Sequence, residues 1–190
     1  MENGSYGKGS FLVANPVLPD PNFSRTVILL CDHNEEGSFG LVVNRKSHLR
    51  AAEVFVNADL LKKSGYDHEV YIGGPVMPSQ VFYLCRYPEP LVDLETVCPG
   101  IQMGMSWENL DEVLRHLENP SQDLRFYMGY SGWGADQLAG EMEQRSWLTR
   151  SAEKDKVFGS PESRIWADVV RSMGAEYEYL LSAPVDPRNN

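Results

Sequence analysis

Short apolar runs separated by turn residues predict three strands in the first part of the chain. Residues 11–14, 26–33 and 39–44 are mostly apolar and contain β-branched side chains, which is typical of strands. Residues 34–37 read Asn-Glu-Glu-Gly, a turn signal that predicts a hairpin between the last two strands. Three prolines lie within residues 16–21, and proline fits neither a helix interior nor a central strand. This segment is therefore predicted to be a loop.

The next part of the chain mixes helical and strand signals. Apolar residues recur at helix-like intervals over residues 51–64 with an interruption near Asn57, so a broken helix is predicted there. Residues 69–72 and 80–85 are predicted strands. Prolines and glycines are scattered through residues 86–106, which favours loop or edge strand.

Helical periodicity is clearest in the last part of the chain. A helix is predicted to begin at Ser106 and to end at Asn119-Pro120, because serine favours the N-cap and the residue before proline disfavours helix. A second amphipathic helix is predicted over residues 163–173. The apolar face of the first helix consists of Leu110, Val113, Leu114 and Leu117.

A strand, a glycine-rich turn and a third helix are predicted between these two helices. Residues 124–130 are the strand, and residues 131–136 are the turn. Leu138 and Met142 lie on one face of the helix that follows, and the aliphatic stem of Arg145 would extend that face. Strands and helices are thus interspersed, which predicts a mixed sheet in an α+β or α/β fold.

The length of 190 residues fits one domain, and no repeat or break in composition divides the chain. We expect a single domain over residues 10–182, with flexible tails at residues 1–9 and 183–190. Hydrophobic residues make up 42% of the chain, which is ordinary for a globular protein and too high for a disordered one.

Charge and cysteine content restrict the function. A net charge of −10 disfavours direct binding to DNA or RNA, because it repels phosphates. The tightest basic stretch, residues 45–50, is short and is predicted to be a solvated loop. The sequence has no apolar run long enough to span a membrane and no signal-peptide pattern at its N-terminus, so we expect neither a membrane span nor a signal peptide. Since the three cysteines, Cys31, Cys85 and Cys98, form no disulfide framework, a reducing cytoplasm is the expected location.

Seven short motifs follow one another along almost the whole chain. They are FLVANPVLPDPNFSRTV at 11–27, CDHNEEG at 31–37, GLVVN at 40–44, GGP at 73–75, GYSGW at 129–133, the segment 137–148, and RIW at 164–166. Together these motifs closely resemble the bacterial AlgH/YqgE family, and the resemblance extends over residues 10–182.

The resemblance implies a compact single domain in which a strongly bent, bifurcated sheet curls into a pseudo-barrel with helices packed outside. Proteins of this family are often labelled transcriptional regulators, and the resemblance implies no enzymatic activity. The negative charge gives direct DNA binding no support, so a regulator of this kind would act through protein contacts. The chain departs from the family pattern at Ser131, where relatives often carry alanine, and at the variable Asn15.

Signals for catalysis are weak. A hydrolase nucleophile elbow requires G-x-S-x-G, but Trp133 occupies the last glycine position after Ser131. Catalysis by Ser131 is therefore the least favoured interpretation of the turn. Glu141 and Glu143 are two residues apart and do not face each other on a helix, so they are predicted to be surface charges.

Two other interpretations of the turn remain. Gly132-Trp133-Gly134 followed by a helix would leave backbone N–H groups free to cradle an anion, although Asp136 would compete for the positive helix end. The favoured interpretation is a tight corner. In that case Gly132 and Gly134 take positive φ or allow close backbone approach, while Trp133 and Trp147 anchor the helix.

Cys31 and His33 are two residues apart, which would place them on one face of a strand and raises the question of a metal site. Zinc sites usually take three or more protein ligands, and no second Cys or His pair accompanies these two. We therefore expect no metal. Cys31 is predicted to be buried, and His33 is predicted to organise the hairpin turn.

Polar residues of the proline-rich loop form another candidate cluster. Arg25 is predicted to pair with Asp20 and so to fix the loop. With Asn15 and Asn44, Arg25 could also line a polar cleft. Gly73-Gly74 is predicted to end a strand in a sharp turn, though such a pair can also let a ligand approach the backbone.

The sequence favours a non-enzymatic cytoplasmic protein, with a regulatory role, that acts through protein or small-ligand contacts and needs no cofactor. It names neither a protein partner nor an oligomeric state. The alternative is a nucleotide- or anion-binding protein, or an enzyme, that uses a cleft near residues 131–136. The candidate ligand-binding residues are Asn15, Arg25, His33, Asn44, Gly73, Gly74, Ser131, Gly132, Trp133 and Gly134.

Overall fold

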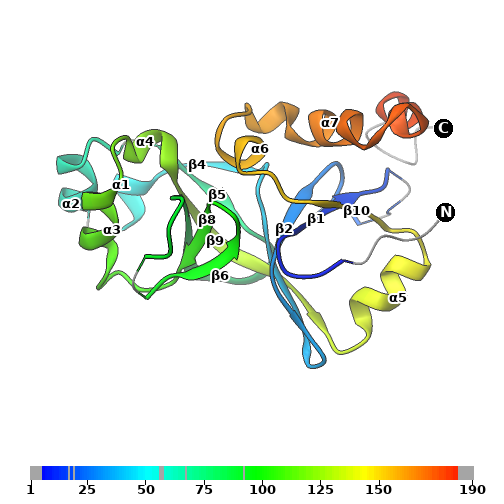
Figure 1. Cartoon of the computed structure of the whole chain (residues 1–190), viewed down its shortest axis with the longest axis horizontal. Coiled ribbons are helices and arrows are strands. Elements are labelled where there is room, and N and C mark those ends of the chain that lie inside the picture. Colours follow the sequence, from blue (N-terminus) through cyan, green and yellow to red (C-terminus); the bar gives the residue numbers. More distant parts are fainter. Residues whose placement is uncertain are drawn as a thin grey trace.

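The computed structural model describes residues 6–183 except 17, 19, 56, 57, 67 and 92, and shows a strongly curled sheet flanked by short helices (Figure 1). The strands are β1 (Ser10–Ala14), β2 (Val27–Asn34), β3 (Gly37–Val42), β4 (Lys46–Arg50), β5 (Glu69–Ile72), β6 (Val76–Arg86), β7 (Glu95–Cys98), β8 (Ile101–Gly104), β9 (Leu124–Gly134) and β10 (Trp147–Ser151). The helices are α1 (Ala51–Val54), α2 (Ala58–Lys63), α3 (Leu110–His116), α4 (Pro120–Asp123), α5 (Gln137–Glu143), α6 (Lys154–Phe158), α7 (Glu162–Met173) and the 3-10 helix η1 (Ala175–Ser182).

Strand β9 belongs to both halves of the sheet and makes it bifurcate. The strand order is β10-β1-β2-β3-β9-β6-β8-β7, and β5 pairs in parallel with β9 and antiparallel with β4. Residues 131–134 at the end of β9 pair with residues 37–40 of β3, whereas residues 124–128 pair with β6. The prediction of a bent, bifurcated sheet with helices outside is confirmed: the sheet curls into a half-barrel.

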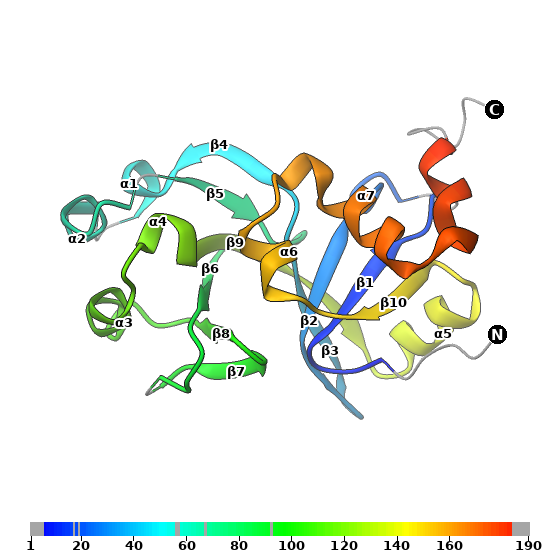
Figure 2. The same cartoon turned by 45° about the horizontal axis from the view of Figure 1, so that its top comes forward.

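Strand β1 is buried on both faces, which explains its continuous apolar sequence. Phe11 and Val13 belong to the core cluster that includes α7, whereas Leu12 and Ala14 belong to the cluster that includes α5. This division follows from the alternation of side chains along a strand. The indole Nε1 of Trp166 on α7 donates to the Ala14 carbonyl at 3.0 Å, and Figures 1 and 2 both place α7 beside β1.

A third apolar cluster lies at the other end of the molecule, where α1, α2 and α3 gather (Figure 2). Its centre is Phe126 on β9, whose ring is fully buried. The Trp107 ring stacks on Phe126 at a centroid distance of 5.5 Å, and Phe55 contacts both rings. This packing fixes the chain between β8 and α3.

Most predicted strands and the helix near residues 163–173 are confirmed, as is the broken helix, which appears as α1 and α2. The predicted loop at residues 45–50 is wrong, because Lys46–Arg50 forms β4 and pairs with β5. Helix α3 begins at Leu110, not at Ser106. Residues 7–9 of the expected N-terminal tail make backbone contacts, since the Gly9 N–H donates to the Leu30 carbonyl at 2.9 Å. Residues 1–5 and 184–190 lie outside the described residues.

The predicted turn at residues 131–136 is also wrong over most of its length. Strand β9 continues through Gly134, and α5 begins only at Gln137. Neither Gly132 nor Gly134 takes a positive φ; Gly129 does, with φ 67°. Arg145 cannot extend the face of α5, because the helix ends at Glu143 and Arg145 has φ 57°. Strand β10, which follows, was not predicted.

Candidate functional site

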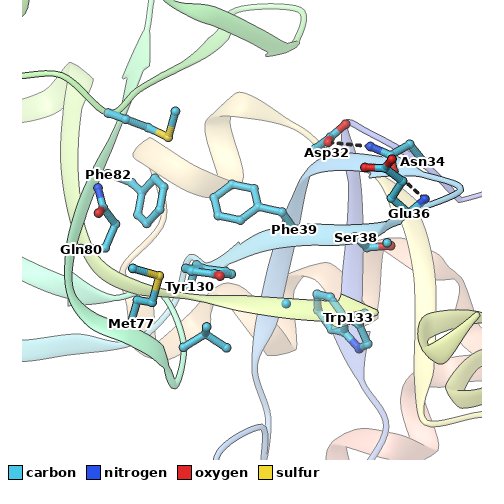
Figure 3. A pocket seen from close by; sticks show the side chains of 14 residues that line it. Asp32, Asn34, Glu36, Ser38, Phe39, Met77, Gln80, Phe82, Tyr130 and Trp133 are labelled. Atoms are coloured by element: carbon cyan, nitrogen blue, oxygen red, sulfur yellow. Dashed lines mark hydrogen bonds between the residues drawn. The ribbon is translucent and has the colours of Figure 1, made fainter. Parts of the chain in front are cut away.

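A groove of about 710 Å³ lies between the β2–β3 hairpin and the first half of β6 (Figure 3). Strand β9 contributes its floor through Tyr130, Gly132 and Trp133, and Met105 after β8 adds to its rim. The groove therefore lies where the two halves of the sheet separate. Its lining combines aromatic rings, exposed methionines and carboxylates, and we take it as the candidate binding site.

Three aromatic rings from three strands form the apolar floor. Phe39 lies 5.1 Å from both Phe82 and Tyr130, measured between ring centroids, and Phe82 lies 5.9 Å from Tyr130. Phe39 on β3 pairs with Gly132 on β9. A Cβ added at Gly132 would come within 3.0 Å of the Tyr130 ring, so the glycine allows that ring its position. The floor thus depends on one of the predicted site residues, though by its lack of a side chain.

Two methionines on the rim are exposed to an unusual extent for large apolar side chains. Met77 is 58% exposed and Met105 is 59% exposed. Met77 lies in an irregular stretch of β6, where the strand advances from Val76 to Val81 while β9 advances only from Tyr130 to Met128. Its φ of 45° is uncommon for a residue other than glycine. Strained backbone of this kind is concentrated at binding sites.

The hairpin end of the groove is acidic. Asp32 accepts a hydrogen bond from the His33 N–H at 2.9 Å. It also accepts from the Asn34 side-chain amide at 3.0 Å, and Asn34 in turn accepts from the Glu36 N–H at 2.8 Å (Figure 3). These bonds shape the turn. Among the described residues that line the groove there is no lysine or arginine. No other described residue makes a hydrogen bond or an ion pair to the Glu36 carboxylate. The groove therefore presents negative charge beside an apolar floor.

Ser131, for which an elbow nucleophile was the least favoured interpretation, does not reach the groove. Its side chain is only 1% exposed, and its hydroxyl donates to the Gly73 carbonyl at 3.2 Å. Gly73 and Gly74 pack directly on β9, because a Cβ added at either one would overlap the backbone of Gly129 or Tyr130. The glycine pair therefore lets strand β9, and not a ligand, come close to its backbone.

His33 and Gly134 line a second, smaller cavity of about 370 Å³ on the other side of the hairpin. The His33 Nδ1 lies 2.7 Å from the Ser38 hydroxyl, so this histidine does organise the hairpin as predicted. The Gly134 N–H donates to the Gln137 side chain at 3.1 Å and is not free for an anion. The described lining contains Glu35 and Asp136 and no lysine or arginine, which disfavours the anion cradle that the sequence left open as an alternative.

Asn15, Arg25 and Asn44 lie elsewhere and hold loops in place. The Asn44 side chain accepts from the Val27 N–H and donates to the Arg25 carbonyl, both at 2.9 Å. Arg25 donates from Nη2 to the Ala183 carbonyl at 2.6 Å and its guanidinium lies 5.0 Å above the Trp166 ring, instead of pairing with Asp20. Asn15 donates to the Arg145 carbonyl at 3.1 Å. These residues do not converge on the groove.

The predicted shared face of Cys31 and His33 is wrong because β2 has a bulge between Leu30 and Asp32. Cys31 is fully buried, and its burial raises the pKa of its thiol far above the usual range, whereas His33 is exposed. No group of three or more His, Cys, Asp or Glu side chains in the described part of the chain could hold a metal ion. Within the same residues, no helix is both long and apolar enough to cross a membrane.

Sequence reasoning missed most of the groove. Gly132 and Trp133 line it, but Phe39, Phe82 and Met77 were not singled out. In the sequence these three look like ordinary strand residues, and only their convergence from separate strands gives them a common surface. The one local signal was the pair of glycines before Pro75, which precedes the irregular start of β6.

Comparison with known proteins agrees with the fold and the motifs. A family model described as AlgH-like matches residues 11–178. The chain belongs to the AlgH-like family. A UPF0301 protein of Cytophaga hutchinsonii is 33% identical over 184 residues, which cover 96% of this chain and 98% of the relative. A UPF0301 protein of Myxococcus xanthus is 39% identical over 171 residues, which cover 90% of this chain and 92% of the relative.

Two solved structures have a similar fold to this AlgH-like protein. The solution structure of AlgH from Pseudomonas aeruginosa is 30% identical, with a TM-score of 0.72, and the match covers 97% of each chain. The crystal structure of a Corynebacterium diphtheriae protein has a TM-score of 0.81 and covers 95% of this chain and 94% of that one. Its identity of 23% makes it evidence of the fold alone.

Proposed function

We propose that this protein is a non-enzymatic binding protein that holds a short segment of a partner protein in the groove. The segment would place apolar side chains on the Phe39, Phe82 and Tyr130 rings and a lysine or arginine beside Asp32 and Glu36. The observation that supports this most directly is the pair of exposed methionines above an aromatic floor. Flexible, polarisable methionine side chains are favoured at surfaces that adapt to apolar partners.

Charge complementarity favours a basic partner. Two carboxylates lie at one end of the groove and the chain as a whole carries a charge of −10, so a cationic segment is attracted both locally and at long range. An anionic ligand such as a nucleotide would be repelled by the same groups. The alternative of nucleotide or anion binding near residues 131–136 therefore finds less support than a basic protein segment.

A regulatory role would follow from such binding, by contact with another protein and without direct contact with DNA. We place this function in the cytoplasm, where the thiols of Cys31, Cys85 and Cys98 would stay reduced. Catalysis by Ser131 finds no support, since its hydroxyl is buried and bonded to a backbone carbonyl.

Selection of displayed random peptides on the immobilised protein tests the proposal. We expect the selected peptides to combine apolar residues with an adjacent lysine or arginine, and to bind more weakly as salt increases. The variant Met105→Glu should weaken binding of the best peptide by about tenfold or more, because it puts a charge on the apolar rim. Leu49→Glu is the matched control, since Leu49 is also exposed (45%) but lies on β4, outside the groove.

A charge variant tests the acidic end separately. Glu36→Gln should reduce affinity by roughly threefold to tenfold at low salt and relax the preference for a basic residue, while Glu118→Gln, an exposed change elsewhere, should not. Peptides enriched without apolar or basic residues, or a best peptide indifferent to Met105→Glu, would refute the proposed function.

A further inference from the structure

We propose that the partner segment binds as an added β-strand along the free edge of β6, between Ser79 and Phe82. This inference rests on the proposed function and specifies how the groove holds its occupant. In such binding, main-chain hydrogen bonds supply affinity and alternate side chains supply specificity. The occupant is an extended protein segment with apolar residues at every second position and a basic residue toward the hairpin.

The edge is open because β8 is much shorter than β6. Strand β6 runs from Val76 to Arg86, but β8 pairs with it only from Arg86 to Tyr83, where Gly104 is the last partner. In the described chain, no strand pairs with the first seven residues of β6 on that side, residues 76–82. On its other side β6 faces β9, with which Val76 and residues 81–85 pair, so an added strand would use the side that β8 leaves open.

The chain after β8 is held away from the edge. Met105 follows Gly104 directly, and Ser106 accepts a hydrogen bond from the Glu108 N–H at 3.1 Å, which starts a turn. The Trp107 ring then stacks on Phe126 in the cluster at the far end of the molecule. Because this aromatic packing fixes the turn, β8 cannot lengthen to cover residues 79–82.

Edge strands are usually protected by proline, charge or bulges. Here Pro78 and the irregular stretch between Val76 and Val81 protect the start of β6, but Ser79 to Phe82 carry no proline and no charge. Pro78 and Ser79 are exposed, and Gln80 and Val81 are half-buried. The Gln80 side chain, which lines the groove, donates to the Val81 carbonyl at 3.4 Å. That carbonyl is therefore within reach of a donor in the groove.

The strand geometry of β6 explains why apolar side chains should occur at alternate positions of the bound partner segment. Gln80 and Phe82 both line the groove, as expected for residues two apart on one strand face. A strand added beside them would direct every second side chain toward the same face, onto the rings of Phe39 and Phe82. The intervening side chains would face away, which predicts an alternating and not a contiguous apolar pattern.

An N-methyl scan of the tightest-binding displayed peptide tests this mode of binding. Methylation of one backbone nitrogen removes one hydrogen-bond donor, so affinity should fall by roughly tenfold at alternate positions and change little at the positions between them. In parallel, hydrogen exchange of the full chain should slow at the amides of residues 79–82 when the peptide binds. The amides of Glu95 and Thr96, on the edge strand β7, are the internal control and should not change.

The outcomes separate the two proposals. A peptide that binds and is weakened by Met105→Glu, but shows no alternating N-methyl pattern and no slowed exchange at residues 79–82, overturns strand addition and leaves the proposed function standing. If no peptide is selected at all, both proposals fail. Alternating loss together with slowed exchange supports both.

Discussion

The indole rings of Trp133 and Trp147 meet edge to face, with their centroids 6.0 Å apart, and both donate to the same carboxylate oxygen. That oxygen is Oε2 of Glu141, at 2.9 Å from Trp133 Nε1 and 2.7 Å from Trp147 Nε1. Trp133 lies on β9 and Trp147 on β10, so one side chain of α5 joins two strands that are not neighbours in the sheet. The prediction that the two tryptophans anchor the helix is confirmed, whereas Glu141 is more than the surface charge predicted from sequence.

Replacing this carboxylate should be costly. In Glu141→Ala both indole N–H groups lose their acceptor in a largely buried setting, and each unsatisfied donor costs about 1–3 kcal/mol, so we expect the free energy of unfolding to fall by roughly 2–6 kcal/mol. Urea unfolding measures the change. Glu143→Ala, on the same helix but exposed, should stay within about 0.5 kcal/mol of the unchanged protein. Equal losses in the two variants would contradict the shared-acceptor role.

Two glycines from the predicted site should respond in opposite ways. A Cβ added at Gly74 would overlap the Tyr130 backbone, whereas one added at Gly134 would meet nothing within 4 Å. Gly74→Ala should therefore lower the free energy of unfolding by about 3 kcal/mol or more, since backbone must shift to relieve the overlap. Gly134→Ala should change it by less than about 1 kcal/mol. Thermal unfolding of both variants provides the comparison, and similar melting temperatures would refute it.

Local pattern was enough for elements whose signal lies within their own sequence. The continuous apolar run at residues 11–14 reflects a strand that is buried on both faces, and the 3.6-residue period of α7 reflects a helix that is buried on one face. The end of β9 was mistaken for a turn because its pairing partner is β3, almost a hundred residues earlier, and that partner keeps Gly132 and Gly134 extended.

The sequence did not predict the groove for a related reason. Phe39, Phe82 and Tyr130 come from β3, β6 and β9, and no spacing in the sequence brings them together. Conversely, Asn44 and Arg25 looked like cleft residues because they are polar and near glycines and prolines, but they satisfy backbone groups of the chain instead. A polar residue beside an irregular loop is as often needed for the loop as for a ligand.

Asn44 provides a direct test of that reassignment. Asn44→Ala removes the acceptor of the Val27 N–H and the donor to the Arg25 carbonyl, so we expect a loss of about 1–3 kcal/mol in the free energy of unfolding. At a temperature where the variant is folded, its affinity for the selected groove peptide should be unchanged. Loss of affinity in the folded variant, measured by fluorescence polarisation, would restore Asn44 as a ligand residue.

The backbone strain at Met77 can be measured by comparing its glycine and alanine variants. Its φ of 45° costs a non-glycine residue roughly 1–2 kcal/mol, and glycine removes this strain at an entropic cost of about 0.5–1 kcal/mol. We therefore expect Met77→Gly to unfold with a higher free energy than Met77→Ala, by up to about 1 kcal/mol, since both variants lose the same side chain contacts. Both should bind the groove peptide more weakly than the unchanged protein. A glycine variant less stable than the alanine variant would contradict the strain at this position.

Buried thiols and phenols should make the fold sensitive to alkali. Burial raises the pKa of Cys85 from 9.0 to about 12 and the pKa of Tyr83 from 10.0 to about 12. Burial also raises the pKa values of Cys31 and Tyr127 well above their usual range. These groups stay protonated in the folded chain while the unfolded chain releases their protons, first from thiols near pH 9.0 and then from phenols near pH 10.0.

The unfolded state therefore binds fewer protons than the folded state above pH 9.0, and the free energy of unfolding must fall as the pH rises through this range. Each such group contributes a slope of about 1.4 kcal/mol per pH unit once its unfolded form is fully ionised. Urea unfolding between about pH 8 and about pH 11 measures that slope. Cys85→Ala removes one titrating group, so its stability should fall less steeply by about 1.4 kcal/mol per pH unit. Parallel curves for the two proteins would show that the Cys85 thiol ionises as readily in the folded chain as in the unfolded one.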